Sequence, residues 1–141
     1  MTLLKMYAIT AIVLALKMSA ISLAQGRARI AAGVFVNPED AKLFGTTQAP
    51  EDAPAVQRAA RAWRNDLETI PIFLILGWIY VAAGLSATAF VVYCVIFVVA
   101  RIGHTVCYLN AIQPMRTIAY TVGALATLGL MVHLLIELVL A

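Results

Sequence analysis

Four apolar stretches, each long enough to cross a lipid bilayer, constrain this chain more than any other feature of its sequence. They run over about residues 3–25, 55–83, 87–111 and 115–140. In the second stretch, the first third is charged and the remainder is apolar. A helix needs about 20 apolar residues, at about 1.5 Å rise each, to cross the hydrocarbon core. The chain is 63% hydrophobic and 12% charged, whereas soluble domains are roughly 45–50% apolar and about 25% charged. The sequence therefore predicts one all-α domain over residues 1–141, an integral membrane protein built as a four-helix transmembrane bundle.

The positive charges indicate how this bundle is oriented. The polar connection over about 26–54 and the head of the second helix contain Arg27, Arg29, Lys42, Arg58, Arg61 and Arg64, and the connection after the third helix adds Arg116. The turn over 83–88 has no charge. Because basic segments stay on the cytoplasmic side, both basic connections are expected there, with both termini opposite. We expect a multi-pass protein of a bacterial inner membrane or the endoplasmic reticulum. With a net charge of only +3, no nucleic-acid partner is expected.

Two polar features lie near the first helix. Lys17 interrupts its apolar run, and a lysine inside a membrane either snorkels to an interface or faces a polar cavity; we favour snorkelling. In the connection that follows, residues 37–40 read NPED. Asparagine as N-cap, proline at the first helical position and two carboxylates near the positive end of the helix dipole predict a short helix start.

Each of the other three helices carries a polar stripe near the same membrane face. The stripes are Arg61, Arg64, Asn65 and Glu68 on the second helix, Arg101, His104 and Tyr108 on the third, and Arg116, Thr117 and Tyr120 on the fourth. An arginine within a membrane helix needs a partner that offsets its insertion penalty. Arg101 has two interpretations: an ion pair with Asp66 or Glu68 that fixes helix packing, or a place in a ligand site. Three stripes at one depth favour a binding site facing the cytoplasm.

The residue types in these stripes indicate the ligand chemistry. Guanidinium groups pair bidentately with carboxylates or phosphates, while Glu68 and Asn65 can receive an ammonium group or amide donors. The site therefore suits a zwitterionic, net-negative ligand such as a small peptide. Arg116 with Thr117 could also stabilise a thiolate, because an adjacent cation and a hydroxyl donor lower the pKa of a thiol from its usual value of about 8.5. The alternative is an interfacial arginine that snorkels beside a hydroxyl.

Metal binding and disulfide formation have little support. His133 and Glu137 are spaced i, i+4 but have no third ligand in reach, so we expect an interfacial pair and no metal site. Cys94 and Cys107 lie on one predicted helix, about 20 Å apart along its axis, which excludes a disulfide between them.

Four motifs together resemble the membrane-associated eicosanoid and glutathione metabolism (MAPEG) family. They are NPED at 37–40, RAWRNDLETIP at 61–71, ARIGHTVCYL at 100–109 and PMRTIAYT at 114–121. The resemblance is to the branch that holds microsomal glutathione S-transferases and prostaglandin E synthases, with the synthases nearer. It implies a homotrimer of four-helix bundles that binds glutathione between subunits on the cytoplasmic side. The positions matching the family's glutathione contacts are Arg29, Arg64, Asn65, Glu68, His104, Tyr108, Arg116, Thr117 and Tyr120, with Arg61 and Arg101 in support.

The expected activity follows from this resemblance and from the thiolate chemistry. Arg116 and Thr117 are expected to act as catalytic residues that stabilise the glutathione thiolate, which attacks a lipophilic electrophile or lipid peroxide arriving from the bilayer. Such an enzyme is a glutathione transferase or peroxidase. One alternative is a glutathione-dependent prostaglandin isomerase, although that pattern has serine where this chain has Thr117. Another is a non-catalytic lipid-binding membrane module, which would not need Arg64, Asn65, Glu68 and Arg116.

Overall fold

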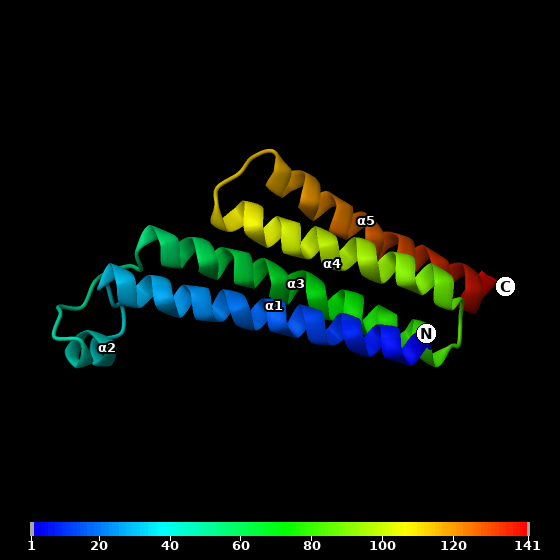
Figure 1. Cartoon of the computed structure of the whole chain (residues 1–141), viewed down its shortest axis with the longest axis horizontal. Helices are drawn as coiled ribbons and strands as arrows, with labels where there is room; N and C mark the ends of the chain where they lie inside the picture. The colour runs from blue at the N-terminus through cyan, green and yellow to red at the C-terminus, as the bar shows by residue number, and fades with distance from the viewer. Residues whose placement is uncertain (1, 141) are drawn as a thin grey trace.

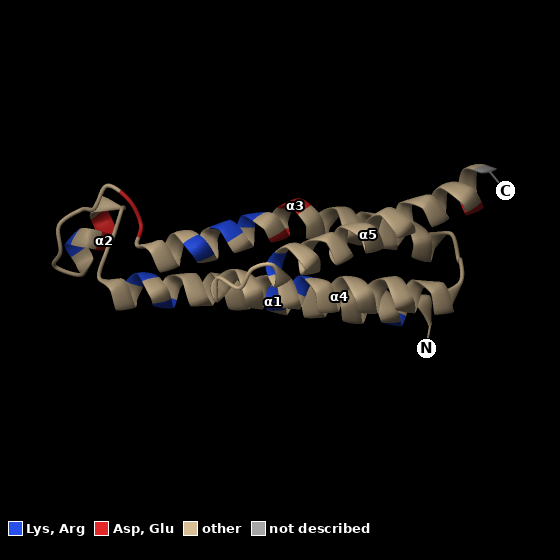
Figure 2. Cartoon of the chain, turned by 90° about the horizontal axis from the view of Figure 1, so that it is seen from above, with Lys and Arg blue, Asp and Glu red and all other residues tan. Residues whose placement is uncertain are grey.

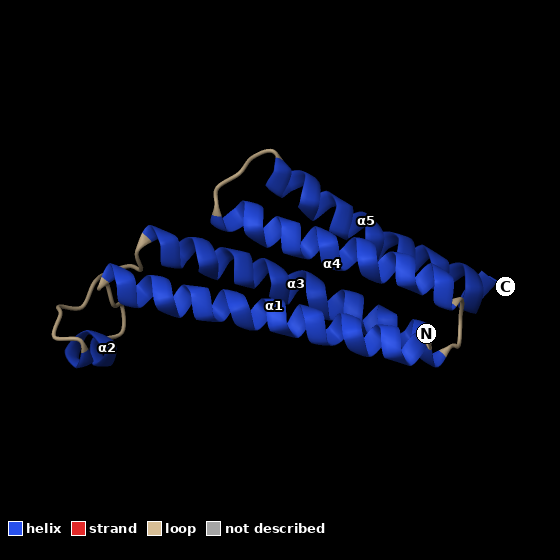
Figure 3. Ribbon diagram, in the orientation of Figure 1, coloured by secondary structure: helices blue, strands red, loops and turns tan. Residues whose placement is uncertain are grey.

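The computed structural model describes residues 2–140, and every regular element within that range is helical. The elements are α1 (Leu3–Ala32), α2 (Pro38–Leu43), α3 (Pro54–Ala82), α4 (Ala87–Leu109), α5 (Met115–Leu135) and a π-helical turn, η1 (Ile136–Leu140), that continues α5. Figure 3 shows these helices joined by loops. Four of them, α1, α3, α4 and α5 with η1, are long and apolar enough to cross a membrane. The predicted all-α, multi-pass membrane fold is therefore confirmed.

The long helices form two antiparallel pairs (Figure 1). α1 packs along α3, and α4 packs along α5. α4 also contacts α1 and α3 and so joins the two pairs, whereas α5 makes few contacts with α3. Both chain ends lie at one end of the bundle, opposite α2 (Figure 1). That arrangement matches the prediction that both termini lie on the same side of the membrane.

α1 is longer than its apolar run suggested. It does not end near residue 25 but continues to Ala32, where Gly33 closes it in the left-handed conformation with φ of 62°. Residues 24–32 read AQGRARIAA, a segment rich in alanine and arginine, which favour helix strongly enough to carry it through one glycine. The end of the apolar run therefore does not end the helix. α1 and α3 both extend beyond the level at which α4 ends (Figure 1).

The connection between α1 and α3 folds back on itself. α2 begins after Asn37, with Pro38 as its first residue, which confirms the helix start predicted from NPED. Phe35 is buried and stacks on Phe44 with ring centres 4.6 Å apart. The Ala49 amide donates to the Phe35 carbonyl at 2.8 Å. This long connection is therefore an ordered structure that brings the chain back to α3.

Aromatic rings pack in the interior of the bundle. Phe73 of α3 stacks on Phe97 of α4 with ring centres 3.9 Å apart, and Tyr80 stacks on Phe90 at 5.1 Å. α3 and α4 approach closely at Gly77, where a Cβ would meet the Phe90 ring at 3.3 Å, a tight contact. Many large apolar side chains point outward instead, as expected where lipid or another copy of the chain covers the helices.

The buried face of α3 continues past the apolar core into its charged first third. Its buried residues are Val56, Ala59, Ala62, Asp66, Ile70, Phe73, Gly77 and Tyr80, spaced three and four apart. A carboxylate thus occupies one position of an otherwise apolar and aromatic inner stripe. α3 continues through Pro71 to Ala82, so the charged turns and the membrane span belong to one helix.

Candidate functional site

The basic residues gather in one half of the bundle. Figure 2 shows the lysines and arginines mostly in the half nearer α2, with Lys5 in the first turn of α1 as the exception. The polar stripes of α3, α4 and α5 lie at that level. The orientation inferred from these basic residues stays a prediction.

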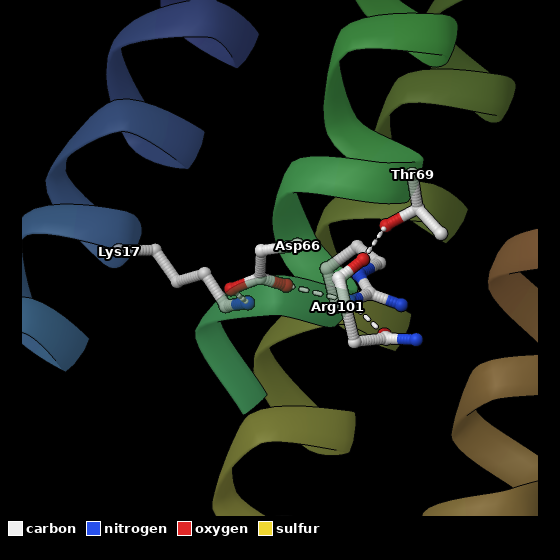
Figure 4. A network of polar contacts seen from close by, with 5 residues as sticks. Lys17, Asp66, Thr69 and Arg101 are labelled. Carbon is white, nitrogen blue, oxygen red and sulfur yellow. Dashed lines mark hydrogen bonds and ion pairs between the residues drawn. The ribbon is translucent and has the colours of Figure 1, made fainter. Parts of the chain in front are cut away.

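A buried ion network joins three helices at this level. The Asp66 carboxylate of α3 accepts hydrogen bonds from the Lys17 ammonium of α1 and, at 2.5 Å, from Nη2 of Arg101 of α4. Figure 4 shows this carboxylate between the two cationic groups. The same Arg101 nitrogen donates to the Asn65 side-chain oxygen at 2.6 Å. Asp66 and Arg101 are only 0% and 1% exposed, so this ion pair is withdrawn from both water and lipid.

This network decides the two questions that the sequence left open. The prediction that Lys17 snorkels to an interface is wrong: its side chain is 8% exposed and paired with Asp66. A buried carboxylate partner offsets the desolvation of the ammonium group, which snorkelling would otherwise avoid. The ion-pair interpretation of Arg101 is confirmed with Asp66 as its partner, whereas Glu68 lies on the exposed face of α3.

A second polar group lies where α4 meets α5. His104 is buried, and its ring centre lies 5.5 Å from that of Tyr108 and 6.0 Å from that of Tyr120. The Arg116 guanidinium carbon lies 4.6 Å above the centre of the Tyr108 ring, a cation–π geometry. We call these four residues the ring cluster.

Gln113 connects Arg116 to Thr117. Arginine offers only donors, so the Gln113 amide is assigned with its oxygen facing the guanidinium. That oxygen accepts from Nη2 and Nε of Arg116 at 2.5 and 3.2 Å, and the amide nitrogen donates to the Thr117 hydroxyl oxygen at 3.1 Å. A cation and a hydroxyl group are thus held side by side at the start of α5.

The ion network and the ring cluster share α4, since Arg101 and His104 are one turn apart and both buried. Between α3, α4 and α5 lies a groove of about 370 Å³ whose lining includes Phe97, Arg101, Tyr120 and Leu128. Its surface is almost wholly apolar. The polar groups therefore lie beside a space that suits a hydrophobic molecule.

Other predicted site residues remain apart from these two groups within one chain. Arg29 pairs with Asp52 through Nε–Oδ1 and Nη2–Oδ2 contacts of 3.2 Å each, and Arg61 donates to the Gln57 side chain at 3.5 Å. Arg64 and Glu68 are exposed, and neither makes a side-chain hydrogen bond or ion pair with the rest of residues 2–140. A single chain thus divides the predicted site between the outer face of α3 and the ring cluster.

The list of site residues taken from the sequence omitted Asp66 and Gln113. A signal for Asp66 was present, because it lies at the helical spacing of Ala59, Ala62 and Ile70 rather than on the stripe of Arg61 and Arg64. An acidic residue on the apolar face of a membrane helix requires a buried cation. Gln113 lies in the loop before α5, where side-chain direction has no periodic signal.

Clustered metal ligands are absent from the part of the chain that the structure describes, where no three His, Cys, Asp or Glu side chains gather. His133 Nε2 lies 3.6 Å from Glu137 Oε1, which confirms the predicted pair. The His133 ring packs against Tyr80 with centres 5.2 Å apart. This pair lies near the chain ends, away from the ion network.

Comparison with known proteins identifies the family. The MAPEG family profile matches residues 7–136. The chain is 36% identical to human prostaglandin E synthase over 125 residues, covering 88% of this chain and 82% of that protein. It is 40% identical to the horse prostaglandin E synthase over 79% of this chain and 74% of that protein. It is also 37% identical to bovine microsomal glutathione S-transferase 1, over 89% of this chain and 84% of that protein. The profile match and these identities show that the chain belongs to the MAPEG family.

Proposed function

We propose that this protein is a membrane-bound glutathione transferase with peroxidase capacity, which activates the thiol of glutathione for attack on lipophilic substrates. The arrangement of Arg116 supports this proposal most directly. Its guanidinium is held over the Tyr108 ring, with Gln113 bridging it to Thr117. A fixed cation next to a hydroxyl group can stabilise a sulfur anion. One relative, microsomal glutathione S-transferase 1, is named for this cosubstrate.

In the proposed reaction, glutathione loses its thiol proton to solvent and the thiolate is stabilised by Arg116 and the Thr117 hydroxyl. The sulfur electron pair forms a bond to an electrophilic carbon of the second substrate, whose leaving group departs with its bonding electrons. With a hydroperoxide, the sulfur attacks the terminal oxygen and the alkoxide leaves, taking up a proton. The apolar groove beside Tyr120 and Leu128 suits a substrate that arrives from the bilayer.

The peptide part of glutathione is assigned to the cationic and amide groups near the same level. Arg64, Asn65 and Glu68 of α3 would receive its carboxylates and ammonium group, together with Arg29 and with the His104, Tyr108 and Tyr120 side chains, while Arg61 and Arg101 support them. Because one chain separates the outer face of α3 from the ring cluster, the proposal includes a homotrimer in which neighbouring subunits complete each site. The outward apolar faces of the helices support such an assembly within the bilayer. The distribution of basic residues supports a site facing the cytoplasm.

A second candidate is a glutathione-dependent isomerase acting on a prostaglandin endoperoxide. The identities of 36–40% with prostaglandin E synthases favour it. Thr117 replaces the serine of that pattern and adds a methyl group beside the reacting centre. A product assay with a prostaglandin endoperoxide separates the two functions. If the assay yields nothing but non-enzymatic breakdown products, the isomerase is excluded. A non-catalytic lipid-binding module would instead show no glutathione affinity by calorimetry.

The central test is a titration of the purified trimer or monomer in detergent with glutathione, followed by thiolate absorbance. Binding with activation raises the thiolate signal at a pH where free glutathione is mostly protonated. Conjugation of an aryl halide and reduction of an organic hydroperoxide are then measured on the same sample. Normal glutathione binding without turnover of any electrophile or peroxide would contradict the proposal.

A further inference from the structure

Asp66 lies outside the set of residues expected to touch glutathione, yet it is the centre of the buried polar contacts. Its two carboxylate oxygens accept hydrogen bonds from different cations. Oδ2 accepts from the Lys17 ammonium, and Oδ1 accepts from the Arg101 guanidinium. The carboxylate is 0% exposed, so it has no role in contacting a ligand directly. Its effect on any ligand must pass through a neighbour.

Asn65 is the neighbour through which that effect can pass. Arg101 uses one nitrogen, Nη2, for both Asp66 at 2.5 Å and the Asn65 side-chain oxygen at 2.6 Å. An arginine has no acceptor, so the Asn65 carbonyl oxygen must face it and the amide NH₂ must point elsewhere. Asn65 is half-buried, between the exposed Arg64 and the buried Asp66. It therefore links the interior of the bundle to the outer face of α3.

Backbone contacts hold this part of α3 as well. The Thr69 hydroxyl donates to the Asn65 backbone carbonyl at 2.8 Å, and Figure 4 shows Thr69 beside the network. The Asn65 backbone is thus tied within α3, while its side-chain oxygen is held by Arg101. Arg101 in turn is held by Asp66 in a buried ion pair, where a misplaced charge is strongly disfavoured.

We propose that Asp66 is a positioning residue for the glutathione site: it fixes Arg101, which turns the Asn65 amide NH₂ toward the ligand. This inference rests on the proposed function. Lys17 has a different part, since it supplies a second cation to Asp66, whereas the hydrogen bond to the Asn65 side chain comes from Arg101. The Asp66–Arg101 pair also fixes α4 against α3 one turn from His104, which keeps the ring cluster at its level.

Two variants that each remove one positive charge distinguish the positioning of Asn65 by Arg101 from ion pairing with Asp66 alone. Lys17→Met leaves Asp66 paired with Arg101, and Arg101→Met leaves Asp66 paired with Lys17; each removes one cation and leaves a one-to-one pair. Arg101→Met is expected to weaken glutathione binding about tenfold, roughly the effect of losing one correctly oriented hydrogen bond. Lys17→Met is expected to leave the dissociation constant within about twofold. Asp66→Asn, where it folds, is expected to resemble Arg101→Met.

A double-mutant cycle on glutathione affinity distinguishes the positioning role from a purely structural one, because only the positioning role predicts non-additive losses at Asn65 and Arg101. If Asp66 and Arg101 act through Asn65, then Asn65→Ala combined with Arg101→Met should weaken binding no more than Asn65→Ala alone. Glutathione affinity is measured by calorimetry on folded protein, with helix content as the control for folding. Additive losses, or equal losses in Lys17→Met and Arg101→Met, would overturn the positioning role while leaving the proposed function in place. No glutathione binding by the wild-type protein would overturn both.

Discussion

The guanidinium carbon of Arg116 lies 4.6 Å above the ring centre of Tyr108, so the last turn of α4 holds the first cation of α5. This contact and the hydrogen bonds to Gln113 together fix the charge at the start of α5. If the charge stabilises a thiolate, it matters more for the reaction than for holding glutathione. Arg116→Ala should then lower kcat about 10- to 100-fold, the range for losing a charge-assisted hydrogen bond, with a smaller effect on glutathione affinity.

The matched variant for this prediction is Arg64→Ala, which removes an exposed arginine of α3. It should weaken glutathione binding first and leave kcat at saturating glutathione close to the wild-type value. Both variants are compared by conjugation kinetics and calorimetry. Equal losses of affinity and turnover in Arg116→Ala would mean that Arg116 only anchors the ligand.

Replacing the ring beneath Arg116 should have a graded effect. Tyr108→Leu removes the aromatic face and should lower turnover at saturating glutathione about two- to fivefold, since a partly exposed cation–π contact contributes about 0.5–1 kcal/mol. Tyr108→Phe keeps the face and should stay near the wild-type rate. A Tyr108→Phe variant as slow as Tyr108→Leu would assign the effect to the phenol hydroxyl instead.

Asp66 should matter more for stability than any exposed carboxylate of the same helix. Asp66→Ala leaves the buried Lys17 and Arg101 without their shared partner, which should lower the free energy of unfolding by about 3–5 kcal/mol. Glu68→Ala, two residues away on the exposed face, should change it by less than about 0.5 kcal/mol. The free energy of unfolding of both variants is measured by denaturation in detergent without glutathione. Similar losses of this free energy in the two variants would contradict the prediction.

Arg29 commits two of its guanidinium nitrogens to Asp52, which limits what it can offer to the proposed site. Their side chains are 30% and 23% exposed, and ion pairs near the surface typically contribute only about 0.2–1 kcal/mol. Asp52→Ala should therefore release Arg29 and tighten glutathione binding by up to about fivefold. In an Arg29→Ala background the same change should have no effect. If Asp52→Ala still tightened glutathione binding in the Arg29→Ala background, the effect would not depend on Arg29, and Arg29 would not belong to the proposed site.

Two glycines of α1 and its cap should respond to alanine in opposite directions. Gly33 ends α1 with φ of 62°, a conformation that costs an L-residue about 1–2 kcal/mol, so Gly33→Ala should destabilise the protein. Gly26 lies within α1, and a Cβ there would meet nothing within 4 Å. Gly26→Ala should stabilise the helix by about 0.5–1 kcal/mol. Thermal unfolding of both variants checks the sign of each change.

Much of the candidate site was visible in the sequence because it lies on regular helices. Helical spacing grouped His104 with Tyr108, and the structure brings their rings together. The same spacing placed Arg61 and Arg64 on a face of α3 that proves exposed. The division of that site within one chain was not visible, because spacing orders residues along one helix and does not fix how far two helices stand apart.

Hydropathy and helical periodicity by themselves determined the four membrane helices and the shared level of the polar stripes, because the backbone hydrogen bonds of a membrane span are satisfied within each helix. The orientation expected from the basic residues stays a prediction. Only the tertiary structure decided that Lys17 turns inward, because the alternative to snorkelling requires a carboxylate that another helix supplies. It also decided that Asp66 rather than Glu68 pairs with Arg101. Those partners are set by which faces of α1, α3 and α4 pack together, and that depends on the fit of side chains across three helices.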